Sequence, residues 1–262
     1  TTQQPRLVKS TLTKLEKISP ELEAEIRQQF TAERYGSTLL KVGWHAKQWN
    51  DNFFRVVDVA RRVDSGVGSF GVGRFYVLLS GTDNDTDNAE NGVILDVKFE
   101  PPPAGEAVLN KLDRAWYRST FRHEAMRAVQ AQRALTSYTD PYTGWVFIHG
   151  AAYAVRQRSP YKASFDLSSL KNYAEFAEYV SYIAAVTATS HTRGTVAHGA
   201  GQFKEVISSA LGPPYARATW GVAVATVAAK YREQVMMDYE CFKDFVQANY
   251  TSDNTNPVEV VD

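Results

Sequence analysis

Three short β-like runs follow one another between residues 53 and 100, and they constrain the fold more than any other feature of the sequence. The runs are RVVDVARRV, RFYVLL (74–79) and GVILDVKFE (92–100), all rich in β-branched and aromatic residues. The connection GTDNDTDNAENG is so polar and turn-rich that we expect an exposed hairpin loop there. The sequence therefore predicts an antiparallel sheet, not a doubly wound parallel one.

A helix is predicted ahead of this sheet. Ser19-Pro20 is a helix cap followed by proline at the first helical position. Leu22, Ile26 and Phe30 then recur at helical spacing. The stretch before the first strand is thus expected to be largely helical.

Helical patterns also interrupt and follow the strands. One or two helices are expected in 104–136, and the run WVFIHGAAYAVRQR (145–158) predicts a β-hairpin. The remainder has helical composition, in segments near 169–191, 202–211 and 215–250. The fold class expected is α+β, with about five strands and an inserted helix.

The same patterns predict a division of the chain. Residues 1–52 form a helical N-terminal segment, 53–165 the antiparallel sheet with its helix, and 166–250 a helical C-terminal part. Residues 251–262 are expected to be a mobile tail.

Composition excludes several classes of function. The 29 basic and 29 acidic residues cancel, so the overall charge does not favour a nucleic-acid partner. No apolar run approaches the length of about 20 residues that crosses a bilayer, so we expect no membrane span and a soluble chain, with the cytoplasm favoured. Cys241, the single cysteine, is expected to be a small buried apolar group on a helix.

One glycine motif carries the first functional prediction. Residues Gly66, Gly68, Ser69, Phe70 and Gly71 form a G-x-G-x-x-G sequence between two β-like runs. In a Rossmann unit this motif opens a helix, whereas a glycine loop between two strands is typical of protein kinases, where its backbone amides cover the phosphates of ATP. An ordinary glycine hairpin is the alternative.

Lys98 lies on the next predicted strand, where kinase-like enzymes place a phosphate-binding lysine. A solvated strand lysine is the alternative reading. Such a lysine needs a carboxylate on the following helix, for which Glu124 is the better candidate and Glu106 the poorer. His191, predicted at a helix end, is a possible auxiliary site residue, although a histidine in such a position is more often a cap or core residue than a catalyst. The histidines and the cysteine show no metal-ligand spacing, so no protein metal site is predicted.

The order of the motifs resembles a known family. After NFFRVVDVA, the glycine motif and ILDVKFE come QRAL, YTDPYTGW, YAVRQRSPYKASFD, ATSHTRG and YREQVMMDYECF. Over about residues 50–245 these segments resemble the domain of unknown function 2252 family, which is grouped with the protein-kinase-like fold. The resemblance implies that 53–165 is similar to a kinase N-lobe, with an ATP cleft under the loop at 66–73. It also implies Lys98 as phosphate ligand, and Arg156 and Arg158 as auxiliary site residues of undefined role.

The chain departs from the family pattern at its catalytic residues. Members of the family carry upstream Gly-Asp-x-His-x-x-Asn-Phe and Asn-Asp-Phe-Asp stretches that look like a kinase catalytic loop and its metal-binding aspartate, an order that resembles a circularly permuted kinase. Neither stretch occurs in residues 1–262. Gln130 stands where many bacterial members have a glutamate.

Two functions are therefore expected. The first is a portion of a kinase-like, ATP- and Mg²⁺-dependent phosphotransferase, whose catalytic loop belongs to an upstream segment or a separate chain. The alternative is a non-catalytic, pseudokinase-like nucleotide-binding or scaffold protein. A helical interaction protein is a third reading, which applies if the glycine motif is a plain surface hairpin. The acceptor substrate and the oligomeric state are left open.

Overall fold

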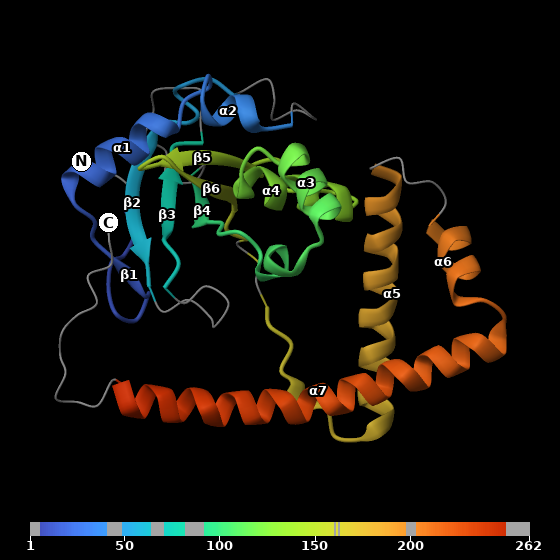
Figure 1. The fold of residues 1–262 in the computed structure, drawn as a ribbon. Coiled ribbons are helices and arrows are strands. Elements are labelled where there is room, and N and C mark those ends of the chain that lie inside the picture. Colours follow the sequence, from blue (N-terminus) through green and yellow to red (C-terminus); the bar gives the residue numbers. More distant parts are fainter. Residues whose placement is uncertain are drawn as a thin grey trace. The chain divides into compact units, whose positions relative to one another are not determined.

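The computed structural model describes residues 6–40, 49–63, 71–81, 92–159, 161, 163–197 and 203–249 (Figure 1). The chain divides into two compact units, Thr1–Ala200 and Gly201–Asp262. Each unit is considered by itself. The predicted tail 251–262 lies outside the described residues.

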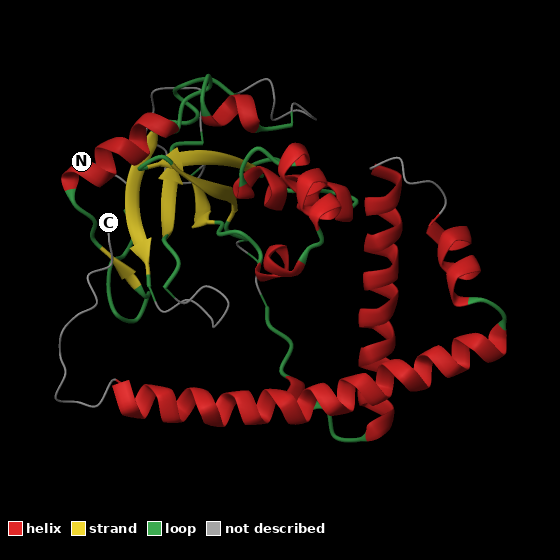
Figure 2. Cartoon of the chain, in the orientation of Figure 1, coloured by secondary structure: helices red, strands yellow, loops and turns green. Residues whose placement is uncertain are grey.

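The first unit is built on a six-stranded antiparallel sheet, whose strands are yellow in Figure 2. The strand order is β1-β2-β3-β4-β6-β5. The strands are β1 (Leu15–Glu16), β2 (Val56–Arg62), β3 (Arg74–Leu79), β4 (Val93–Phe99), β5 (Gly144–Ile148) and β6 (Ala151–Gln157). The predicted α+β class and antiparallel sheet are confirmed. The two-residue strand β1 was not predicted.

Alternation along the strands gives the sheet two different faces. In β4 the side chains of Val93, Leu95 and Val97 belong to the hydrophobic core, whereas Asp96 and Lys98 point to the opposite face. The core face therefore follows from sequence periodicity, and the charged residues of β4 gather on the other face.

Helices cover both sides of this sheet. The helices of the first unit are α1 (Pro20–Gln29), α2 (Tyr35–Thr38), α3 (Lys111–Thr120), α4 (Glu124–Leu135) and α5 (Tyr173–Ala197), with 3₁₀ turns at Ala104–Val108 and Leu167–Ser169. The Oγ of Ser19 accepts the N–H of Leu22, as the predicted cap requires. From this start α1 places Ile26 in the core, which Phe30 and Tyr35 complete.

Helix α4 packs on β5 and β6. The ring of His123, at the start of α4, contacts Trp145 and Phe147, which alternate with the buried Val146 of β5. Since successive side chains of a strand point to opposite faces, Trp145 and Phe147 lie on the face opposite to Val146. The sheet register shows that this is the face that bears Asp96 and Lys98. Helix α4 therefore covers that face over β5 and β6.

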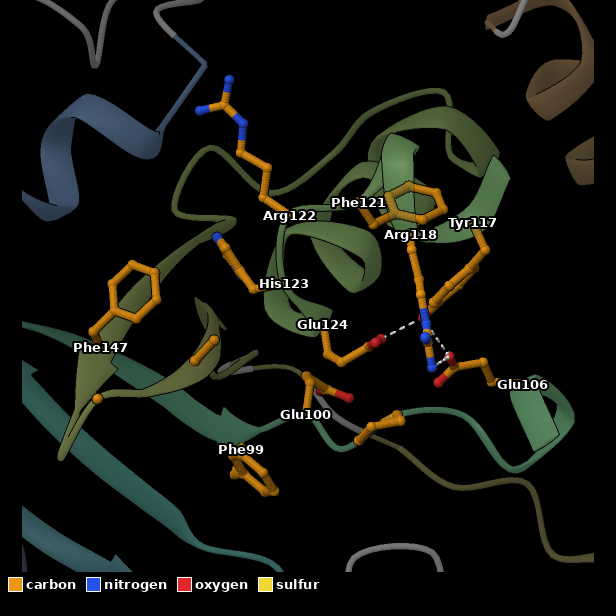
Figure 3. A pocket seen from close by; sticks show the side chains of 13 residues that line it. Phe99, Glu100, Glu106, Tyr117, Arg118, Phe121, Arg122, His123, Glu124 and Phe147 are labelled. Carbon is orange, nitrogen blue, oxygen red and sulfur yellow. Dashed lines mark hydrogen bonds and ion pairs between the residues drawn. The ribbon is translucent and has the colours of Figure 1, made fainter. Parts of the chain in front are cut away.

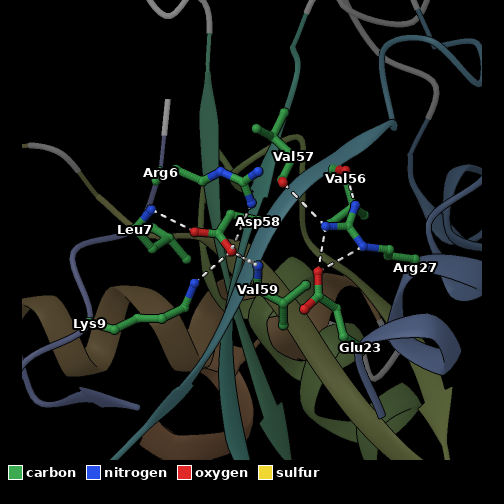
Figure 4. A network of polar contacts seen from close by, with 9 residues as sticks. All are labelled: Arg6, Leu7, Lys9, Glu23, Arg27, Val56, Val57, Asp58 and Val59. Atoms are coloured by element: carbon green, nitrogen blue, oxygen red, sulfur yellow. Dashed lines mark hydrogen bonds and ion pairs between the residues drawn. The ribbon is translucent and has the colours of Figure 1, made fainter. Parts of the chain in front are cut away.

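A buried carboxylate fastens the N-terminal segment to β2 (Figure 4). Asp58 accepts hydrogen bonds from the N–H of Leu7 at 2.8 Å and from Nζ of Lys9 at 2.6 Å. On the other side of β2, Arg27 of α1 donates to the carbonyl of Val57 at 3.2 Å. Strand β2 is thus held from both faces.

The second unit consists of α6 (Phe203–Leu211) and α7 (Pro214–Asn249), with Gly212 at φ +68° between them. This glycine lies at the interruption predicted between the helical segments 202–211 and 215–250. The prediction that Cys241 is buried was wrong: its side chain is exposed, because the apolar residues around it on α7, such as Phe242 and Phe245, are themselves exposed. No helix in the described ranges combines the length and apolarity of a membrane span.

Candidate functional site

Lys98 and Arg156 line one cavity of about 120 Å³, formed where β4 and β6 meet α4. The cavity is lined by Asp96, Lys98, Glu100, Ala128, Val129, Gln132, Ala154, Val155 and Arg156. The sheet thus brings together Lys98, the predicted phosphate ligand, and Arg156, a predicted auxiliary residue.

Lys98 meets a carboxylate that comes from its own strand end. Its Nζ lies 3.5 Å from Oε1 of Glu100, two residues further along. Side chains two residues apart on a strand share a face, so Glu100 can pair with Lys98 without a carboxylate from a helix. The polar residue that α4 contributes to the cavity is Gln132.

Glu124 lines a second cavity, of about 520 Å³, at the start of α4 (Figure 3). Its Oε2 accepts a hydrogen bond from the hydroxyl of Tyr117 at 2.5 Å and another from Nε of Arg127 at 2.6 Å. Burial and the bond to Glu124 raise the pKa of Tyr117 to about 12, so this tyrosine stays a proton donor at neutral pH. The pairing of Glu124 with Lys98 stays a prediction.

Glu100 lines both this second cavity and the cavity of Lys98. Glu106 is paired there with Arg118 at 2.9 Å. His123 caps α4 by accepting the N–H of Met126 on Nδ1, and burial lowers its pKa. A neutral imidazole is the form that can accept this bond.

Asp96 and Arg74 were missed by sequence reasoning. The buried Asp96 accepts two hydrogen bonds from Arg74 of β3, Nε to Oδ1 and Nη2 to Oδ2, each at 2.6 Å. The hydrogen bond to Asp96 raises the pKa of Arg74. Arg156 of β6 approaches the same carboxylate, with its Nη2 at 3.5 Å from Oδ2. The signal in the sequence is an aspartate inside an apolar strand, two residues before Lys98.

Further arginines extend the charge along this face. The guanidinium of Arg158 lies 5.6 Å from the ring centre of Tyr76, and that of Arg62 lies 6.0 Å from it. Tyr76 is the β3 partner of Asp96 in the sheet register. We call the group Arg62, Arg74, Lys98, Arg156 and Arg158 the cationic face.

The glycine motif falls on the connection between β2 and β3, which are antiparallel neighbours. Gly66, Gly68, Ser69 and Phe70 lie outside the described residues, and Gly71 has φ +73°, a left-handed conformation that suits glycine.

His191, the remaining predicted auxiliary residue, lies inside α5, because this helix continues to Ala197 and does not end at residue 191. It is not among the residues that line the cavity of Lys98.

Comparison with known proteins places the chain in a family. The sequence matches the model of a family described as an uncharacterized protein conserved in bacteria, DUF2252, over residues 1–245. The chain belongs to the DUF2252 family. The DUF2252 match extends the predicted resemblance toward the N-terminus, so that it includes α1 and β1. No curated protein and no solved structure matches the chain.

Proposed function

We propose that this DUF2252 chain is the nucleotide-binding portion of a kinase-like, ATP-dependent phosphotransferase. The observation that carries the proposal is the order of parts on the sheet. The connection with the glycine motif joins β2 to β3, Lys98 follows on β4, and α4 packs beside the cavity that Lys98 lines. Protein kinases use a glycine-rich loop, a strand lysine and a neighbouring helix in this order.

The chemistry assigned to these residues is binding and charge neutralisation. ATP supplies the phosphoryl group that is transferred. Lys98 is a compact cation on a rigid strand, suited to pairing with the α- and β-phosphates while the loop amides cover them. Positioning and electrostatic stabilisation account for most of the catalysis in this reaction class.

Other parts of the reaction are assigned elsewhere. No group of three or more His, Cys, Asp or Glu gathers in the described part of the chain to hold a metal ion, so we name no Mg²⁺ ligand there. The catalytic base belongs, in this proposal, to a segment or separate chain outside the present sequence.

One observation favours the alternative of a non-catalytic scaffold. The cavity at Lys98 holds about 120 Å³, whereas small-molecule sites usually measure roughly 300–1,000 Å³. In the scaffold reading the same fold serves as a surface for partners, and Lys98 only pairs with Glu100.

An ATP-binding titration with and without Mg²⁺ distinguishes the two readings. Lys98→Ala removes a charge-assisted contact worth about 1.5–3 kcal/mol, so ATP affinity should fall roughly 10- to 150-fold. Lys111→Ala, an exposed lysine on α3, is the matched control and should bind like the unchanged chain. If the unchanged chain has no affinity for ATP, or Lys98→Ala binds equally well, the scaffold reading replaces this proposal.

A further inference from the structure

We propose that Arg156 is a second phosphate-binding side chain, so that the polyphosphate tail of a nucleoside di- or triphosphate lies between cations of two neighbouring strands. The inference rests on the proposed function and assigns a role to a residue that the family resemblance left undefined.

The sheet register places the two cations side by side. Lys98 is paired with Ala154, and Asp96 with Arg156, so Arg156 is the diagonal neighbour of Lys98 on the same face. Diagonal neighbours on antiparallel strands lie about 7–8 Å apart, within reach of long side chains. Both side chains line the same cavity.

The basic side chains around the Lys98 cavity outnumber the carboxylates that they contact. Arg74 forms two 2.6 Å bonds to Asp96 and compensates its charge, and Lys98 pairs with Glu100. Arg156 reaches Asp96 only at 3.5 Å, the outer limit of a hydrogen bond. The three cations Arg74, Lys98 and Arg156 therefore share the two carboxylates of Asp96 and Glu100, and Arg156 has the weakest of these contacts.

Exposure distinguishes Arg156 from Arg74. The side chain of Arg74 is 17% exposed and that of Arg156 is 56% exposed, while the Asp96 carboxylate between them is 6% exposed. Asp96 thus lies beside one edge of the Arg156 guanidinium, and the exposed side chain leaves its other N–H groups accessible. A planar guanidinium fork matches the geometry of phosphate oxygens.

If Arg156 binds a phosphate group, its replacement should weaken the binding of ATP and ADP and not that of adenosine. We would titrate the full chain with adenosine, AMP, ADP and ATP, using isothermal calorimetry. Arg156→Gln should weaken ATP and ADP binding by about tenfold or more, since a charge-assisted contact is lost, and leave adenosine binding unchanged. Arg156→Lys keeps the charge and should retain part of the affinity.

Arg61→Gln is the matched control, because Arg61 is an exposed arginine of the same sheet that alternates to the opposite face from Tyr76 and Arg62. Its ATP affinity should equal that of the unchanged chain. Circular dichroism of each variant reports whether the fold is kept, and Arg156→Lys serves as the readout if Arg156→Gln fails to fold.

The outcomes separate the two proposals. If ATP binds, Lys98→Ala weakens it and Arg156→Gln does not, the role of Arg156 is overturned while the proposed function stands. Equal losses for adenosine and ATP in Arg156→Gln indicate a structural role and also overturn it. If the unchanged chain binds no nucleotide, the proposed function fails and the inference fails with it.

Discussion

Asp58 and Asp96 are buried carboxylates on the same sheet that are neutralised in different ways. Asp96 meets two arginines within the sheet, whereas Asp58 meets Lys9 and the backbone of the N-terminal segment. Burial by itself raises the pKa of Asp58, but the hydrogen bonds from Lys9, Leu7 and Val59 outweigh it and lower the pKa below its usual value. Asp58 is therefore ionised throughout the neutral range.

This lowered pKa predicts a loss of stability in acid. The unfolded chain binds a proton at Asp58 near pH 3.9, before the folded chain does, so the stabilisation is complete above that pH and disappears as pH falls through the lower folded pKa. Asp58→Asn should lower the free energy of unfolding at pH 6 by about 1–3 kcal/mol. Urea unfolding at pH 6 and pH 3 checks this: the difference between variant and unchanged chain should shrink at pH 3, and a constant difference would contradict it.

At the scale of elements, Gly144 determines how closely α2 approaches β5. A Cβ at this position would lie 2.4 Å from Oγ1 of Thr38 and 2.8 Å from Cδ2 of Leu39. Gly144→Ala should therefore destabilise the chain by about 1–3 kcal/mol through overpacking. Thermal unfolding measures the effect, with Gly105→Ala as control because a Cβ there meets nothing within 4 Å. Equal melting temperatures for the two variants would show that α2 can move away from β5.

Sequence patterns predicted elements better than the contacts between them. Strand β3 coincides with the predicted run 74–79, because a short continuous run of aromatic and aliphatic residues after a glycine-rich stretch favours a strand. Strand β1 was missed, since two residues carry no period. The bonds of Asp96 to Arg74, and of Glu124 to Tyr117, depend on sheet register and helix packing, which local periodicity does not specify.

Helix α5 of the first unit carries many exposed apolar side chains. The large exposed ones are Tyr173, Phe176, Val180, Tyr182, Ile183, Val186 and Val196. A helix that is apolar on most sides is normally covered by other protein. We therefore expect the purified chain to self-associate as its concentration rises, and Ile183→Lys to reduce this association.

Sedimentation velocity over a roughly 50-fold range of protein concentration tests this expectation. Thr192→Lys, an exposed polar position on the same helix, is the control and should sediment like the unchanged chain. A single monomeric species at every concentration would contradict the expectation.

The strand order also determines when the site is completed during folding. Strands β2, β3 and β4 pair in sequence, and β5 pairs with β6, so both groups can form through local contacts. The pairing of β4 with β6 instead joins distant parts of the chain. It therefore costs more chain conformational entropy than the local pairings do. Lys98 and Arg156 lie on opposite sides of this junction. A refolding molecule therefore brings Lys98 and Arg156 together only at this late, non-local step. The rate at which nucleotide binding is recovered during refolding would measure the rate of that step.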